Sequence, residues 1–142
     1  MKVIILILAA IILTGITTFA QQNIIDSLIH QGYQRNYTLH LPTSYNNSKS
    51  TPLVVFLHGG GGNALSAQRF TGFNQVSNQY SFLVAYPEAH YESKPNSFIW
   101  ADGRNTAADK SGIDDIGFIN KLLDTLIFDY NIGIFPKSHW IF

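Results

Sequence analysis

The sequence of 142 residues contains no cysteine, which excludes disulfide scaffolds and cysteine-based metal sites. It also lacks an excess of charge of either sign, because nine lysines and arginines stand against nine aspartates and glutamates. No cluster of basic residues supplies the positive surface that binds a nucleic-acid backbone or an anionic membrane. We therefore expect neither of these partners, and no motif points to a metal ion or another cofactor.

A long apolar run occurs only at the amino terminus. Residues 3–13 are all apolar, and Thr18 and Ala20 place small side chains three and one positions before Gln21. This pattern is typical of a secretory signal peptide, cleaved before Gln21; an uncleaved membrane anchor is the alternative. We expect residues 1–20 to be a signal peptide, the protein to be secreted or periplasmic, and no membrane contact to remain after cleavage.

Three segments of the remaining chain have the pattern of strands. Residues 34–41 alternate apolar and polar side chains and stop at Pro42, which predicts a half-buried strand near a sheet edge. Residues 53–57 and 82–86 are short continuous apolar runs, as in strands of a parallel sheet that are buried on both faces.

Two segments have the spacing of helices. Apolar residues recur at helical intervals over residues 73–80 and 111–130, and Ser111 with Asp114 predicts a capping box at the start of the second helix. Residues 88–108 show no period and are expected to form a long surface loop. Strands followed by helices predict an α/β fold with helices packed on a mostly parallel sheet.

Four consecutive glycines follow His58, directly after one of the predicted buried strands. Their spacing fits neither the dinucleotide-binding nor the Walker phosphate motif. A HGGG-type loop after a central strand can instead donate backbone N–H groups to the negative charge of an acyl-transfer intermediate. We therefore predict an oxyanion-hole loop at His58, Gly59, Gly60 and Gly61, with a plain flexible turn as the alternative.

Six segments, in this order, resemble one protein family. The chain is similar over about residues 34–132 to the secreted esterases of the α/β-hydrolase superfamily grouped as polyhydroxybutyrate depolymerase and feruloyl esterase-like proteins. The segments are Arg35-Asn36-Tyr37 with Leu41-Pro42, residues 52–63, Thr71-Gly72-Phe73-Asn74, residues 82–88, Trp100-Ala101-Asp102-Gly103-Arg104, and residues 114–119.

The resemblance implies an α/β-hydrolase-type fold and the hydrolysis of carboxylic esters, of the polyester or the feruloyl or acetyl class, by a Ser-His-Asp triad. The nucleophile of the family lies in a G-x-S-x-G elbow on the strand after the helix at residues 111–130. No G-x-S-x-G occurs here, and the similarity stops after residue 132. We expect residues 21–132 to be the N-terminal half of a hydrolase domain, truncated before the nucleophile strand, and residues 133–142 to be a divergent tail.

Such a chain would be inactive alone, with its triad expected beyond Phe142. Ser138 and His139 are adjacent and would point to opposite faces of an extended segment, so they cannot form a nucleophile–base pair. The alternative function is that of a non-catalytic secreted protein that binds an ester or a glycan. An oligomeric state cannot be inferred.

The other candidate residues have two interpretations each. His58 is expected to shape the loop and not to act as the general base. Asp114 and Asp115 could form a pair of carboxylates for acid–base chemistry, but their place in a first helical turn favours a capping role. Trp100, Asp102 and Arg104 are predicted to line the substrate cleft; a surface aromatic residue beside a local Asp–Arg contact is the alternative.

Overall fold

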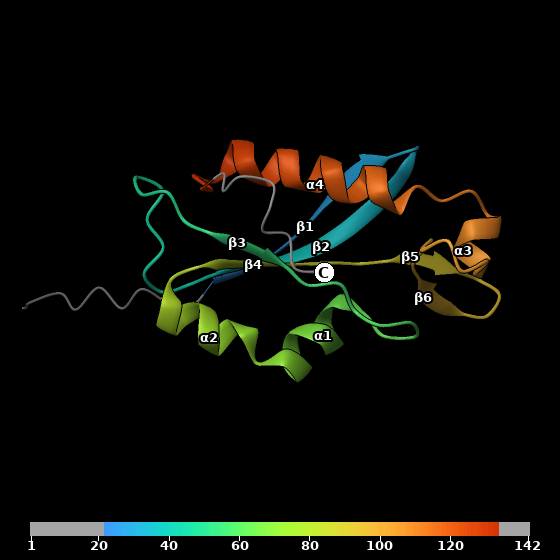
Figure 1. Ribbon diagram of the computed structural model, residues 1–142, viewed down its shortest axis with the longest axis horizontal. Coiled ribbons are helices and arrows are strands. Elements are labelled where there is room, and N and C mark those ends of the chain that lie inside the picture. Colours follow the sequence, from blue (N-terminus) through green and yellow to red (C-terminus); the bar gives the residue numbers. More distant parts are fainter. Residues whose placement is uncertain (1–21, 134–142) are drawn as a thin grey trace, which may run out of the picture.

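The computed structural model describes residues 22–133, so the predicted signal peptide and all but the first residue of the predicted tail lie outside the described residues. A four-stranded sheet with the order β1-β2-β4-β3 forms the centre of the molecule (Figure 1). Its strands are β1 (Gln22–His30), β2 (Tyr33–Leu41), β3 (Leu53–Val55) and β4 (Leu83–Pro87).

The prediction of a mostly parallel sheet is wrong. Among the four described strands of this sheet, β3 and β4 are the one parallel pair, whereas β2 runs antiparallel to both β1 and β4. The reason is an amino-terminal hairpin, in which Gln31 and Gly32 both have positive φ angles (49° and 79°) and form the two-residue turn that suits the twist of paired strands. This hairpin also moves β2 from the expected edge to the interior of the sheet.

Strand β1 was not expected from the sequence. Its apolar residues Ile24, Ile25, Leu28 and Ile29 do not alternate with polar ones, so they lack the period of a half-buried strand. Ile24 and Leu28 pack against the core, while Ile25 remains 82% exposed. Pairing with β2 along nine residues, and not the apolar pattern, therefore determines this strand.

Helices cover both faces of the sheet (Figure 1). On one face lies α4 (Asp115–Asp129); on the other lie α1 (Ala64–Thr71) and α2 (Phe73–Tyr80). Strand β4 is buried along its whole length and divides its side chains between two cores. Leu83 and Ala85 pack with α4, and Val84 and Tyr86 pack with α1.

The helix predicted over residues 111–130 begins later. A short helix, α3 (Ala107–Lys110), precedes it, and Gly112 separates the two with a left-handed φ of 71°. Ser111 is therefore not the N-cap of α4. Asp114 is, because its side chain accepts a hydrogen bond from Gly117 N at 2.8 Å. The capping interpretation of Asp114 is confirmed.

The expected long loop at residues 88–108 contains secondary structure. Strands β5 (His90–Glu92) and β6 (Ser97–Ile99) pair as a separate antiparallel hairpin, and the first residues of α3 follow. These strands have only three residues each, too few for an alternating pattern to stand out in the sequence.

The chain returns to the sheet after α4. Thr51 and Ile132 form an isolated parallel bridge, with hydrogen bonds from Thr51 N to Asn131 O (2.8 Å) and from Gly133 N to Thr51 O (3.0 Å). The segment after α4 thus runs beside the segment that leads into β3, at the sheet edge away from β4. The family resemblance predicts a strand after this helix.

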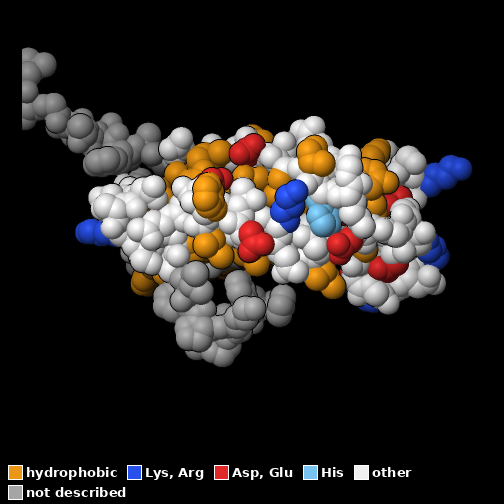
Figure 2. Space-filling view, turned by 90° about the horizontal axis from the view of Figure 1, so that it is seen from above, with side chains coloured by type: hydrophobic (Ala, Val, Ile, Leu, Met, Phe, Trp, Pro, Cys, Tyr) orange, Lys and Arg blue, Asp and Glu red, His pale blue; other side chains and the backbone are white. Residues whose placement is uncertain are grey.

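The surface over α4 carries no strongly charged patch. Figure 2 shows hydrophobic side chains in separate groups, with charges of both signs between them. Among the described residues, no helix is long and apolar enough to cross a membrane.

Candidate functional site

The glycine loop leaves the sheet at the carboxyl ends of the two parallel strands. Phe56 N still donates to Ala85 O at 2.9 Å, after which the chain passes through His58 into Gly59. Glu88 follows β4 directly and reaches the same edge. Ligands of α/β sheets bind at this edge, where the loops after neighbouring strands meet.

Two of the four glycine amides in the loop donate hydrogen bonds to backbone carbonyl groups. Gly62 N donates to Gly59 O at 3.0 Å and Gly61 N donates to Phe98 O at 3.3 Å. Within the described part of the chain, the N–H groups of Gly59 and Gly60 have no such partner, and both residues are exposed. Two backbone donors are therefore available to a ligand.

The four glycines differ in whether the fold needs them. Gly61 has a left-handed φ of 78°, and a Cβ on Gly62 would lie 3.1 Å from Gly59 O. A Cβ on Gly59 or Gly60 would meet no atom within 4 Å, and neither residue has a left-handed φ. The fold explains the glycines at 61 and 62, whereas at 59 and 60 their absence of side chains leaves open space beside the free donors.

His58 is buried directly before the loop. Its Nδ1 donates to Gly59 O at 2.8 Å, and its Nε2 lies 2.9 Å from a Glu88 carboxylate oxygen and 3.1 Å from Ala89 N. A protonated Nε2 donates to Glu88, and a deprotonated one accepts from Ala89 N–H. Burial lowers the pKa of His58, but the hydrogen bonds to Glu88 and Gly59, together with nearby negative charge, raise it overall.

These contacts support the loop-shaping interpretation of His58. Both ring nitrogens already have partners within the protein. A general base needs a free nitrogen within hydrogen-bond reach of the proton that it removes.

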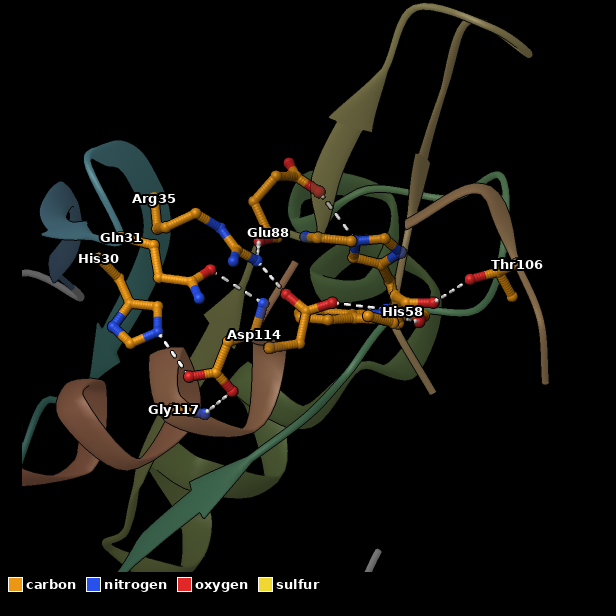
Figure 3. A network of polar contacts seen from close by, with 12 residues as sticks. His30, Gln31, Arg35, His58, Glu88, Thr106, Asp114 and Gly117 are labelled. Carbon is orange, nitrogen blue, oxygen red and sulfur yellow. Dashed lines mark hydrogen bonds and ion pairs between the residues drawn. The ribbon is translucent and has the colours of Figure 1, made fainter. Parts of the chain in front are cut away.

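Arg35 and Asp115 form a buried ion pair behind the loop, with exposed fractions of 3% and 6%. Arg35 Nη2 also donates to the Glu88 carbonyl oxygen at 3.2 Å, and its guanidinium lies 4.0 Å from the centre of the Phe118 ring. The second Asp115 oxygen accepts from Ala101 N at 2.6 Å. Figure 3 shows Arg35 beside Glu88 in the network of polar contacts that also includes His58.

Trp100 packs against His58, the residue directly before the glycines. Its Nε1 donates to His58 O at 2.8 Å, and its ring centroid is 5.2 Å from that of His58. Thr106 Oγ1 in turn donates to Trp100 O at 3.1 Å. The indole thus supports the strand end from which the glycine loop starts.

Asp102 and Arg104 do not join this cluster. They pair with each other across two residues, and 81% of the Arg104 side chain is exposed. The mutual hydrogen bond lowers the pKa of Asp102 and raises that of Arg104. Nothing in the geometry brings either residue to the loop, which corresponds to the local-contact alternative.

Sequence reasoning missed Arg35 and Glu88 as site residues and interpreted Asp115 as a cap. All three lie in segments that carry the family resemblance, at the start of Arg35-Asn36-Tyr37, after Pro87 and beside Asp114. Their position within these segments was the available signal. In residues 22–133 no group of three or more metal-ligating side chains comes together.

The comparisons with known proteins assign the family. The sequence profile described as Esterase PHB depolymerase matches residues 35–125, more than half of the chain. The chain belongs to this esterase family. The match begins at Arg35 and includes the glycine loop, Glu88 and Asp115, so the clustered residues all lie in the part that defines the family here. No curated protein matches the sequence.

Solved structures show the same fold. A fluorophosphonate-binding serine hydrolase of Staphylococcus aureus, in a substrate-bound form, superposes with a TM-score of 0.55 at 16% identity, covering 80% of this chain and 43% of that protein. An S-formylglutathione hydrolase of the same organism, without ligand, gives a TM-score of 0.51 at 15% identity, with 80% and 42% covered. The chain of this esterase family member thus spans less than half the length of either hydrolase.

Proposed function

We propose that the chain is the N-terminal half of a serine carboxylic-ester hydrolase, and that the N–H groups of Gly59 and Gly60 belong to its oxyanion hole. The observation that carries this proposal is that the amides of Gly59 and Gly60, on a loop at the carboxyl edge of the parallel strands, have no hydrogen-bond partner among residues 22–133. The family match and the serine hydrolases of similar fold support the reaction class.

Besides these oxyanion-hole donors, the proposed reaction requires little of this half of the molecule. When a serine attacks an ester carbonyl, negative charge develops on the carbonyl oxygen, and prearranged N–H donors stabilise it. Loss of one such donor typically slows turnover by about 10²–10³-fold. The sequence contains no G-x-S-x-G, so the proposal places nucleophile, acid and base outside these 142 residues.

Binding of a carboxylate product tests the oxyanion loop in this chain. We expect butyrate to shift the amide NMR signals of Gly59 and Gly60, and neutral butyramide to shift them less. Gly60→Ala should keep the effect, because its Cβ enters open space. Gly60→Pro, which removes the donor, should weaken it. Equal responses to butyrate in the Ala and Pro variants would contradict the proposal.

Absence of turnover is the second expectation. The 142-residue chain should hydrolyse p-nitrophenyl butyrate at the background rate. Hydrolysis above background that persists in Ser138→Ala and His139→Ala variants would show that the triad mechanism does not apply to this chain.

The finer parts of the proposal concern substrate and location. The substrate class is a polyester or a feruloyl or acetyl ester, as the family resemblance implies. The pattern of residues 1–20 supports secretion. Mass spectrometry of the protein exported by a bacterial host should find Gln21 at its amino terminus, and a mature chain that still begins at Met1 would oppose this part.

A small cavity favours binding without catalysis as the second candidate. It has a volume of about 160 Å³, and its lining residues are aromatic, polar and charged: Tyr33, Gln34, Arg35, Asn36, Glu88, Ala89, His90, Tyr91 and Phe98. Aromatic residues beside polar and charged ones suit a single ring of a glycan or of an aromatic ester. NMR shifts at Tyr33 and Tyr91 with methyl glucoside or methyl ferulate, without shifts at Gly59 and Gly60, would favour this candidate.

A further inference from the structure

We propose that Glu88 is the positioning residue of the glycine loop, because its single carboxylate ties both ends of that loop together. For its catalytic meaning the inference rests on the proposed function. The geometry itself concerns only residues of this chain, and can be tested without substrate.

The two ends of the loop meet at this carboxylate. Before the glycines, His58 Nε2 lies 2.9 Å from Glu88 Oε1. After them, Ala64 N donates to the two Glu88 oxygens at 3.1 and 3.2 Å. Residues 59–63 are therefore enclosed between two contacts to the same side chain. Figure 3 shows the first of these, with Glu88 directed at the imidazole.

Glu88 is itself held in place from the sheet. It directly follows β4, its N donates to Asn36 O at 2.9 Å, and its carbonyl oxygen accepts from Arg35 Nη2 at 3.2 Å. Its side chain is 16% exposed, so surrounding protein limits the rotamers that it can adopt. A carboxylate fixed in this way transmits the position of β2 and β4 to the loop.

A carboxylate suits both contacts at once. Ala64 is the first residue of α1, where backbone N–H groups have no partner within the helix and carry partial positive charge. The imidazole becomes positive when its Nε2 is protonated. Asn63 caps the same helix by accepting from Ser66 N, which leaves the N–H of Ala64 to Glu88.

The inference explains how a glycine-rich loop can present ordered donors. Glycine has more backbone freedom than any other residue, so free N–H groups on Gly59 and Gly60 would point in many directions without external restraint. Preorganised donors are what stabilise an oxyanion, because no reorganisation is then needed during the reaction. Glu88, which touches neither donor, would act through His58 and Ala64.

The test uses the full chain with three variants. Glu88→Ala removes both contacts, Glu88→Gln keeps an oxygen for Ala64 N but removes the charge, and Asp124→Asn removes an exposed carboxylate on α4 as a control. Circular dichroism first checks folding. NMR then measures the titration midpoint of the His58 ring and the hydrogen exchange of the loop amides.

We expect both Glu88 variants to lower the His58 midpoint, and Asp124→Asn to leave it unchanged. We also expect the amide hydrogens of Gly62 and Ala64 to exchange about tenfold faster or more in Glu88→Ala, through local opening. In Glu88→Gln they should exchange at close to the wild-type rate. An unchanged His58 midpoint in Glu88→Gln, or unchanged exchange in folded Glu88→Ala, would overturn the inference. If Glu88→Ala does not fold, the midpoint in Glu88→Gln decides.

These results are independent of those for the proposed function. Loss of the butyrate response in the wild type, with the Glu88 effects intact, would refute the oxyanion hole and leave the positioning role. Absence of the Glu88 effects, with the butyrate response intact, would refute the positioning role and leave the oxyanion hole.

Discussion

Two Arg–Asp pairs occupy opposite situations in this molecule. Arg35 and Asp115 are 80 residues apart in sequence, come from β2 and α4, and are almost fully buried. Arg104 and Asp102 are two residues apart in one loop, and most of the Arg104 side chain is in solvent. The distant pair links the sheet and a helix with Glu88 and Ala101, whereas in the described part of the chain the hydrogen bonds of the local pair stay within residues 102–104.

The difference teaches which charged residues a sequence reveals. Asp102 and Arg104 stand out because they are close together in a motif, yet an exposed pair gains little from its attraction in water. Arg35 and Asp115 are inconspicuous in the sequence, yet breaking a buried pair leaves one charge without a partner in low dielectric surroundings. Proximity along the chain is thus a poor guide to structural importance.

Breaking the buried pair should have the largest effect. We expect Asp115→Ala to lower the free energy of unfolding by about 3–5 kcal/mol, since Arg35 would remain buried and Ala101 N would lose its acceptor. Urea unfolding followed by tryptophan fluorescence measures this. The double variant Arg35→Met/Asp115→Leu should lose less free energy of unfolding than the sum of the losses in the single variants Arg35→Met and Asp115→Leu. Additive losses would show that the two residues are not coupled.

Gly117→Ala should have the next largest effect, because it disturbs the end of α4 that carries Asp115. A Cβ at this position would overlap the Asp114 carboxylate and come within 2.8 Å of the His30 ring. We expect a loss of about 1–3 kcal/mol, as for overpacking in general. Gly60→Ala, whose Cβ meets no atom within 4 Å, is the control. Equal unfolding midpoints in the two variants would mean that the helix start adjusts freely.

The His58–Glu88 contact should give a smaller, pH-dependent effect. The pKa of His58 is raised above its ordinary value of 6.5, so its contribution to stability is complete below that pH and is lost as pH rises through the raised value. The free energies of unfolding of wild type and Glu88→Gln should therefore converge as pH increases above 6.5. A difference that stays constant or grows over this range would contradict the assignment.

Removing the exposed pair should have the smallest effect. Arg104→Ala should leave the urea midpoint unchanged at low and at high salt, because this side chain is largely in solvent. The difference in urea midpoint between the wild type and Arg104→Ala should not depend on pH near neutrality, since the contact moves the pKa of Asp102 down and that of Arg104 up. A clear loss of stability would show that the contrast between the two pairs is overstated.

The sequence predicted those parts of the fold that have a regular local pattern. Strands β2, β3 and β4 and helices α2 and α4 all appear within a few residues of their expected places. Strand β1 was not predicted, because its pairing with the neighbouring strand defines it. Strands β5 and β6 were not predicted, because three residues are too few to show a period. The direction of the strands depended on that unseen hairpin, which is why a parallel sheet was expected.

The candidate site was predictable only in part. His58 and the glycines form a compact motif in the sequence, and the structure brings Trp100 to His58. Glu88 and Arg35 could not be assigned, because their roles depend on the alignment of β2 with β4, which joins Tyr37 to Pro87. The alternating pattern of a strand determines which of its faces is buried, but it does not identify the residue that lies opposite on a distant strand.

The wide separation of the clustered residues also has a consequence for the order of folding. The β1–β2 hairpin joins neighbours in sequence, and such hairpins close in about 1–10 μs. The contact between Arg35 and Asp115 instead closes a loop of 80 residues and requires α4 to be docked. Contacts of long sequence separation form slowly. The loop and its supports should therefore assemble late, after the β1–β2 hairpin has formed.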